Sequence, residues 1–176
     1  MRNARGSVWA AAATALGLVT AAQVPQAASV TELRRFALDD LEGVLTRSGV
    51  ELDTATSSDG KASLRVTATE PRTVRLFEVT GLEIDNARLI YEARVRTEGV
   101  QGQVFLEMWC HFPGQGEFFS RGLDTPMSGT TEWSSLETPF FLRAGEKPDL
   151  VKLNLVVEGT GTVWIDDVRL TRRPLQ

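Results

Sequence analysis

The feature that most constrains the fold of this chain is an alternation of two residue sets along short segments. In QVFLEMWCHF, residues 103–112, every second residue is apolar. The set comprises Val104, Leu106, Met108, Cys110 and Phe112. Successive side chains of a β-strand point to opposite faces, so this period of two predicts a strand with one face in a core.

The same signal recurs along most of the chain. Alternation or enrichment in β-branched and aromatic residues marks 62–69, 73–79, 87–97, 103–112, 136–142, 150–159 and 162–171. Turn-forming segments such as SSDGK, EGVQG and GTG separate them. Within 29–45 we expect the second half to form a first edge strand and a turn. The sequence predicts an all-β fold, an antiparallel two-sheet β-sandwich of the jelly-roll type.

The N-terminus has a different character. Arg2 and Arg5 precede an apolar run over 8–22 that ends in small residues, which is typical of a secretory signal peptide. An uncleaved anchor is the alternative, but spanning a bilayer takes about 20 apolar residues. We therefore expect 1–28 to be signal peptide and short linker and 29–176 to be a single domain. The protein is then exported, periplasmic or extracellular, with no membrane insertion after cleavage.

Charge argues against a nucleic-acid-binding protein, and cysteine content excludes a fold held by intramolecular disulfides. The net charge is −4, and cleavage after residue 22 would remove two arginines and bring it to −6. An acidic chain with dispersed cations is a poor ligand for nucleic acid. The single cysteine, Cys110, cannot form an intramolecular disulfide, so we expect stability from the core, an ion or a partner.

Catalysis has little support in the sequence. Cys110 and the only histidine, His111, are neighbours on a predicted strand and therefore point to opposite faces. A carboxylate pair that included Glu107 could in principle serve a glycosidase, but many surface acids give such a pairing no specificity. We expect no enzyme activity.

Five segments in order carry a family resemblance: DDLEG, DGKASLRV, LIYEARVRT, TTEW and GTVWIDDVRL. Over 36–171 the chain resembles the galactose-binding-like β-jelly-roll superfamily and is most similar to carbohydrate-binding modules of xylanases and cellulases. The resemblance implies a non-catalytic module that binds a polysaccharide or other glycan on a sheet face. The alternative is an assembly domain that docks an envelope or secreted protein through the same fold.

The resemblance also implies a structural calcium ion. Its ligands would be Asp166 or Asp167, with Glu42, for which Asp40 could substitute, and the backbone near Gly60 and Lys61. Adjacent strand residues face opposite sides, so one of the two aspartates should point inward or toward a sheet edge. The alternative is that Asp167 caps a turn or pairs with Arg169 while Asp166 faces water.

For the glycan, the alternation defines a candidate face. The set opposite the core side in three strands is Phe105, Glu107, Trp109, His111; Arg88, Ile90, Glu92, Arg94, Arg96; and Lys152, Asn154, Val156, Glu158. We expect Trp109 to stack on a sugar ring, with Phe105 beside it. The expected polar partners are Glu107, His111, Arg94, Glu92 and Asn154.

Two alternatives remain for this face. A loop over 113–122 or the N-terminal segment could cover Trp109 and Phe105 as a second minor core, leaving Glu107 and Arg94 as a cross-strand ion pair. The longer loop 111–133 carries Phe118, Phe119 and Arg121 and could itself bind ligand. Its segment EFFSR favours instead a short strand that packs Phe118 or Phe119 into the core.

Overall fold

The computed structural model describes residues 29–175, and these form eight strands and no helix. The predicted signal peptide lies outside the described residues. The strands are β1 (Thr31–Phe36), β2 (Val50–Asp53), β3 (Ser63–Ala68), β4 (Arg72–Thr80), β5 (Ala87–Phe112), β6 (Gly116–Arg121), β7 (Met127–Leu142) and β8 (Leu150–Pro174). Within the described residues there is no helix that is long and apolar enough to cross a membrane.

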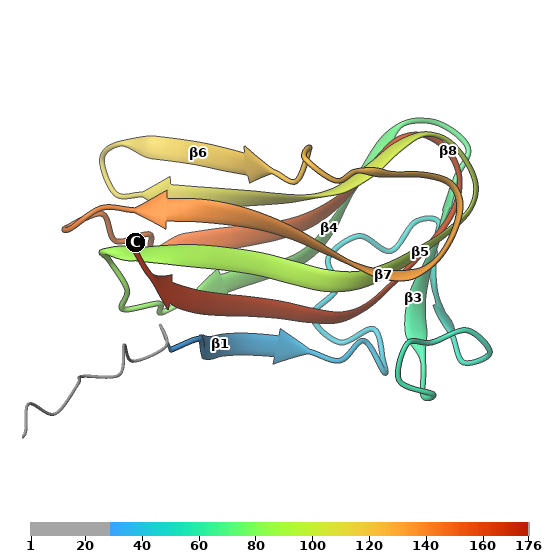
Figure 1. The fold of residues 1–176 in the computed structure, drawn as a ribbon, viewed down its shortest axis with the longest axis horizontal. Coiled ribbons are helices and arrows are strands. Elements are labelled where there is room, and N and C mark those ends of the chain that lie inside the picture. The colour runs from blue at the N-terminus through green and yellow to red at the C-terminus, as the bar shows by residue number, and fades with distance from the viewer. Residues whose placement is uncertain (1–28, 176) are drawn as a thin grey trace, which may run out of the picture.

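Two long strands organise the molecule. β5 has 26 residues and β8 has 25, and they pair antiparallel from Ala87 opposite Pro174 to His111 opposite Leu150. Each merges two strands that the sequence predicts as separate. EGVQG and GTG are therefore not turns, and the prediction that they end strands is wrong. The chain bends there while the pairing continues, as the curved ribbons at one end of Figure 1 show.

Glycines make that bend sterically accessible. Gly102 pairs with Gly159 in the middle of the two long strands. A Cβ atom on Gly102 would lie 1.9 Å from the carbonyl oxygen of Glu158, and one on Gly159 would lie 1.7 Å from that of Gln101. Only glycine lets the two backbones approach this closely.

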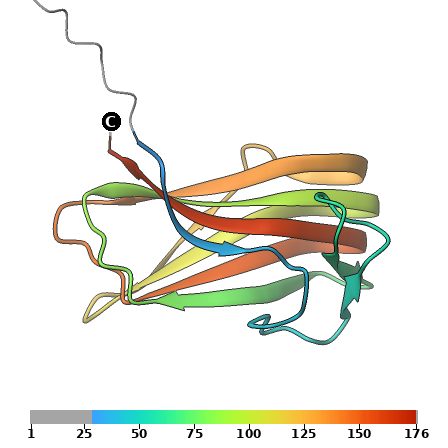
Figure 2. The same cartoon turned by 90° about the horizontal axis from the view of Figure 1, so that it is seen from below.

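The bend divides one continuous sheet into two layers (Figure 2). In the first layer, the N-terminal half of β5 lies between the C-terminal halves of β7 and β8, and β8 also pairs with β1 and β3. In the second layer, the C-terminal half of β5 pairs with β6 and with the N-terminal half of β8, which pairs with β4. The predicted all-β antiparallel sandwich is confirmed, but its two layers belong to one folded-over sheet and not to the two sheets expected.

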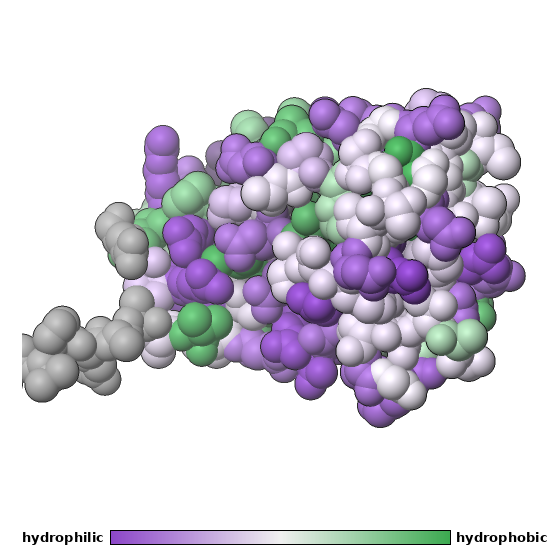
Figure 3. Space-filling model, turned by 45° about the vertical axis from the view of Figure 1, so that its right-hand side comes forward, coloured by the Kyte–Doolittle hydropathy of each residue, from purple (hydrophilic) through white to green (hydrophobic). Residues whose placement is uncertain are grey.

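The core lies between the layers and follows the predicted alternation. Its members include Val104, Leu106, Met108, Cys110 and Phe112 of β5, all buried, together with Leu89, Tyr91, Ala93 and Val95 of the same strand and Val151, Leu153, Leu155 and Val157 of β8. Burial of each large apolar side chain contributes about 1.5–3 kcal/mol. On the face shown in Figure 3, hydrophilic residues spread widely and hydrophobic ones form small separate patches.

Some elements differ from expectation. The first strand lies in the first half of 29–45, at β1, and β2 was not expected at all. EFFSR does form strand β6, but its packing into the core does not occur, because Phe118 and Phe119 are 49% and 53% exposed. β6 lies at the edge of the second layer, beyond the core.

A β-bulge explains the adjacent aspartates. Glu92 pairs with Arg169 and Arg94 with Asp166, so two residues of β8 lie opposite Ala93 alone. Asp167 has a positive φ of 47°. The core side of β8 consequently runs Val163, Ile165, Val168, Leu170. Both carboxylates therefore lie on the outer side, and the expectation that they point to opposite faces is wrong.

Candidate functional site

The outer surface of the second layer carries the best-formed site, which we call the Trp109 face. Its residues are Thr73, Arg75, Glu107, Trp109, Glu117, Phe119, Arg121, Lys152 and Asn154. Strand pairing puts them in rows. Phe119, Trp109 and Lys152 form one row across β6, β5 and β8. The next row contains Arg121, Glu107, Asn154 and Arg75.

The first row supplies an aromatic platform. The ring centroids of Trp109 and Phe119 lie 4.9 Å apart, with their planes tilted by 43°. The guanidinium of Arg121 lies 4.8 Å from the centre of the Phe119 ring, within cation–π distance. Trp109 is half-buried and Phe119 is exposed, so this platform is open to a ligand.

Glu107 is the polar centre of the face. Its carboxylate accepts hydrogen bonds from Trp109 Nε1 at 2.7 Å, Asn154 Nδ2 at 3.1 Å and Arg121 Nε at 2.7 Å, while only 4% of the residue is exposed. Burial by itself raises the pKa of this carboxyl, but the three hydrogen bonds outweigh it and hold the pKa below its usual value. Glu107 thus fixes the orientation of Trp109 rather than offering free oxygen atoms.

Two shallow hollows flank this centre. One, of about 250 Å³, is lined by Thr73, Arg75, Trp109, Glu117, Lys152 and Asn154. The other, of about 300 Å³, includes Arg72, Thr73, Glu107, Arg121, Val156 and Glu158. Thr73 lines both, so the two hollows lie side by side over β5, β8 and β4, and we call the pair the groove.

Two other predicted residues lie on β5 near this groove without lining it. His111 is half-buried and its Nδ1 contacts Asp149 Oδ1 at 2.5 Å. Phe105 is buried, with 1% exposure, and so offers no surface for stacking. Cys110, which precedes His111 in the chain, points into the core, away from the His111 side chain. Burial raises the pKa of the Cys110 thiol to about 12.

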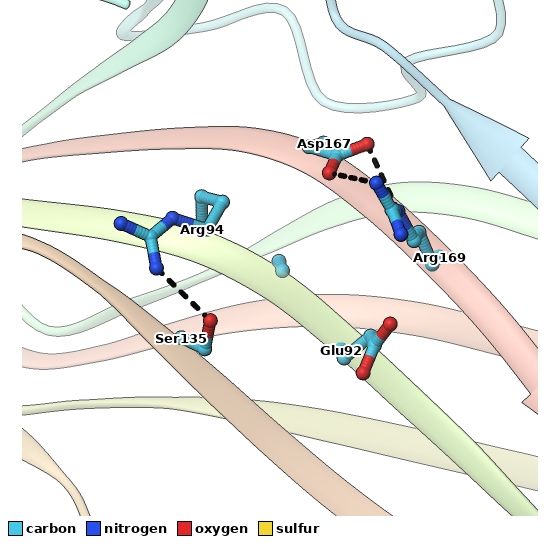
Figure 4. Close-up of a pocket in the computed structure, with 6 residues that line it drawn as sticks. Glu92, Arg94, Ser135, Asp167 and Arg169 are labelled. Atoms are coloured by element: carbon cyan, nitrogen blue, oxygen red, sulfur yellow. Dashed lines mark hydrogen bonds and ion pairs between the residues drawn. The ribbon is translucent and has the colours of Figure 1, made fainter. Parts of the chain in front are cut away.

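Glu92 and Arg94 are not brought to Trp109. They lie on the N-terminal half of β5, in the first layer, where they line a separate hollow of about 240 Å³ with Ser135, Asp167 and Arg169 (Figure 4). The prediction that three strands share one face is wrong, because β5 folds over between Arg94 and Glu107. Glu107 pairs instead with Arg121.

The predicted calcium ligands have protein partners. Asp166, 1% exposed, accepts hydrogen bonds from the backbone N and Oγ of Ser58 at 2.8 and 2.7 Å. Asp167 pairs with Arg35 at 2.8 Å and with Arg169 at 2.6 Å. Its pairing with Arg169 was one of the expected alternatives and is confirmed, whereas the expectation that Asp166 faces water is wrong.

The other three predicted ligands do not join them. Asp40 accepts a hydrogen bond from the backbone N of Glu42, and Lys61 pairs with Asp39. Over residues 29–175 no three acidic, histidine or cysteine side chains are grouped so that they could hold a metal ion. The arrangement as it stands does not fit a calcium site. Calcium binding stays a prediction from the resemblance, and thermal unfolding with and without EDTA tests it.

Comparison with known proteins places the fold. No protein-family model matches the chain, and no curated protein does. Among solved structures, the xylan-binding CBM22-1 domain from Paenibacillus barcinonensis Xyn10C matches with a TM-score of 0.62 and 15% identity, covering 86% of this chain and 100% of that domain. The chain has the fold of a carbohydrate-binding module.

Other structures extend the comparison. The C-terminal family 22 module of Clostridium thermocellum Xyn10B matches with a TM-score of 0.55 and 10% identity, covering 79% of this chain and 92% of that module. The Stig cyclase Fisc from Fischerella sp. TAU matches with a TM-score of 0.51 and 13% identity, covering 81% and 85%. The carbohydrate-binding-module fold is therefore shared with a cyclase, and fold alone does not assign an activity.

Sequence reasoning did not place Phe119 and Arg121 on the Trp109 face. A signal was available: Pro113 and Gly114 begin a turn after β5, and an antiparallel hairpin about that turn aligns Phe119 with Trp109 and Arg121 with Glu107. In this carbohydrate-binding-module fold, the hairpin thus completes the aromatic platform.

Proposed function

We propose that this protein is an exported, non-catalytic module that binds a glycan on the Trp109 face. The observation that carries the proposal is the exposed Trp109–Phe119 platform beside a groove lined with hydrogen-bonding groups. The similarity to xylan-binding modules supports it. Export rests on the predicted signal peptide.

The chemistry of the groove suits a sugar. The apolar face of a pyranose ring stacks on an aromatic ring, and its hydroxyl groups exchange hydrogen bonds with planar polar side chains. Asn154 and Arg75 border the platform and supply such groups, and Lys152 adds an ammonium donor. Each cation on this face is paired with a carboxylate, as Lys152 is with Glu117. Arg72, at the edge of the second hollow, instead donates to the backbone carbonyl oxygens of Ser48 and Thr67. The Trp109 face is therefore suited to a neutral glycan.

The tilt of the platform bears on the form of the ligand. Two rings inclined by 43° cannot both lie flat on one planar surface. A flexible chain can twist to contact both rings. We therefore expect soluble single chains to bind better than a crystalline polysaccharide.

A second candidate function is docking of an envelope or secreted protein. It is favoured by a separate aromatic hollow of about 260 Å³, lined by Phe112, Phe118, Phe140 and Phe141 with Gln115 and Arg143 at its edge. Phe118 and Phe141 are 49% and 59% exposed. Exposed aromatic residues of this kind are typical of protein interfaces.

A retention assay separates the two functions. The purified protein is applied to immobilised soluble xylan and to insoluble xylan and cellulose, beside Trp109→Ala and Phe119→Ala. Phe141→Ala is the matched control, because Phe141 is as exposed as Phe119 but lies outside the groove. We expect retention of the wild type and of Phe141→Ala and loss in the other two variants. If the wild type is retained on none of the polysaccharides, glycan binding is contradicted and protein docking becomes the favoured function.

A further inference from the structure

The hollow on the first layer has an unusual distribution of polar groups (Figure 4). Arg94 is held by two acceptors on β7, the carbonyl oxygen of Trp133 at 2.8 Å and Oγ of Ser135 at 3.0 Å. Arg169 is held by Asp167. The two guanidinium groups are thus fixed at opposite sides of the hollow, each with further N–H donors free.

Glu92 lines the same hollow on the side of Arg169, and Arg94 points away from Glu92 toward Ser135. Among residues 29–175 the Glu92 carboxylate takes part in no hydrogen bond and no ion pair, although it is half-buried and strand pairing places it beside Arg169. Its charge acts on Arg169 across the strand pair without a direct contact. The hollow therefore offers one free acceptor and two fixed donors.

The backbone that shapes the hollow is strained. Asp167 has a φ of 47°, and its side chain is held by both Arg35 and Arg169. A β-bulge re-aims side chains, and here it places Asp167 and Arg169 on the same side as Glu92. A residue held in a sparsely populated conformation by several partners is common at ligand sites.

We infer that this hollow is a second binding site, for a vicinal diol of a neutral polyhydroxy compound such as a monosaccharide. One hydroxyl donates to Glu92, and its neighbour accepts from Arg94 or Arg169. Two guanidinium groups and two carboxylates line the hollow, so a charged ligand gains little. Its volume of about 240 Å³ is sufficient for one sugar ring. The inference goes beyond the proposed function and does not depend on it, because the two sites lie on different layers.

Nuclear magnetic resonance titration with D-xylose, D-glucose and D-galactose tests this site separately from the Trp109 face. The readouts are the backbone amides of Ala93, Ser135 and Asp167 and the Nε–H signals of Arg94 and Arg169. We expect saturable shifts with at least one sugar, unchanged in Trp109→Ala. Glu92→Gln should weaken binding about tenfold, because the hydroxyl then donates to a neutral amide oxygen instead of a charged carboxylate.

Glu137→Gln is the matched control, because Glu137 is the cross-strand neighbour of Glu92 but is exposed and does not line the hollow. It should bind like the wild type. The inference is overturned if none of the three sugars produces saturable shifts at these residues, or if Glu92→Gln binds as the wild type does. Loss of these shifts in Trp109→Ala would also overturn it, because the two sites would then not be independent.

Discussion

At the level of single residues, Glu107 has the largest part in positioning the Trp109 face. Its three donors come from β5, β6 and β8, so one buried carboxylate joins three strands. Without it, Trp109 Nε1 and Arg121 would lose their acceptor. The orientation of the platform therefore depends on a residue that a ligand would hardly touch.

Acid should reveal this role of Glu107. Because its folded pKa is depressed, its contribution to stability is complete above the usual value of 4.5 and is lost as the pH falls through the folded pKa. Urea unfolding from pH 7 to pH 3 should show a fall in the free energy of unfolding below about pH 4.5. Glu107→Gln should be less stable than the wild type at pH 7 by about 2 kcal/mol and less sensitive to acid. An equally steep acid dependence in this variant would contradict the account.

Tyr91, unlike Glu107, is a buried polar residue whose side chain has no hydrogen-bond partner in the part of the chain that the structure describes. Its hydroxyl is fully buried and has no hydrogen-bond partner among the described residues. An unpaired buried hydroxyl costs about 1–3 kcal/mol, so Tyr91→Phe should be as stable as the wild type or more stable by about 1 kcal/mol. Chemical unfolding monitored by circular dichroism measures this change. Destabilisation by more than 1 kcal/mol would show that the hydroxyl has a partner.

The ionisation of Tyr91 offers a second readout. It is the only tyrosine of the chain, and burial raises the pKa of its phenol. Absorbance of tyrosinate should therefore appear on raising the pH only when the protein unfolds, and circular dichroism recorded on the same samples locates that transition. Tyrosinate formation in the folded protein would be contrary to the burial described.

At the level of elements, the glycine pair at the bend of β5 and β8 decides the fold. Gly102→Ala and Gly159→Ala would each place a Cβ atom against a backbone carbonyl, so each should cost more than about 3 kcal/mol or prevent folding. Gly114→Ala is the control: its φ is 74°, but nothing lies within 4 Å of its Cβ position, so it should cost about 1 kcal/mol. Thermal unfolding of the three variants measures the difference. Equal losses would show that backbone conformation, not close approach, matters at the bend.

The elements also show what the sequence could predict. Alternation predicted the inward residues of β5 and β8 correctly, because a period of two is a direct consequence of strand geometry. It did not predict the bend, because glycines mark both a turn and a close approach of two strands. The bulge was not predicted, although the apolar alternation of β8 changes phase at the aspartate pair, from Val163 and Ile165 to Val168 and Leu170.

At the level of the whole molecule, long-range pairing determines which predicted site residues meet. Trp109, Glu107 and Asn154 come together because β5 and β8 pair along their C-terminal and N-terminal halves. Arg94 and Glu92 are in the same strand as Trp109 but are carried to the other layer by the bend. A single sequence gives the face of each strand segment, but not the layer to which the segment belongs.

On this description of the molecule, the Trp109 face binds a glycan chain. The most direct measurement follows the indole N–H signal of Trp109 and the side-chain amide of Asn154 by nuclear magnetic resonance while soluble oligosaccharides of xylan, cellulose and mannan are added, with Trp109→Phe to assign the indole. We predict saturable shifts of both signals with at least one oligosaccharide. If none of them moves either signal, the Trp109 face is not a glycan site.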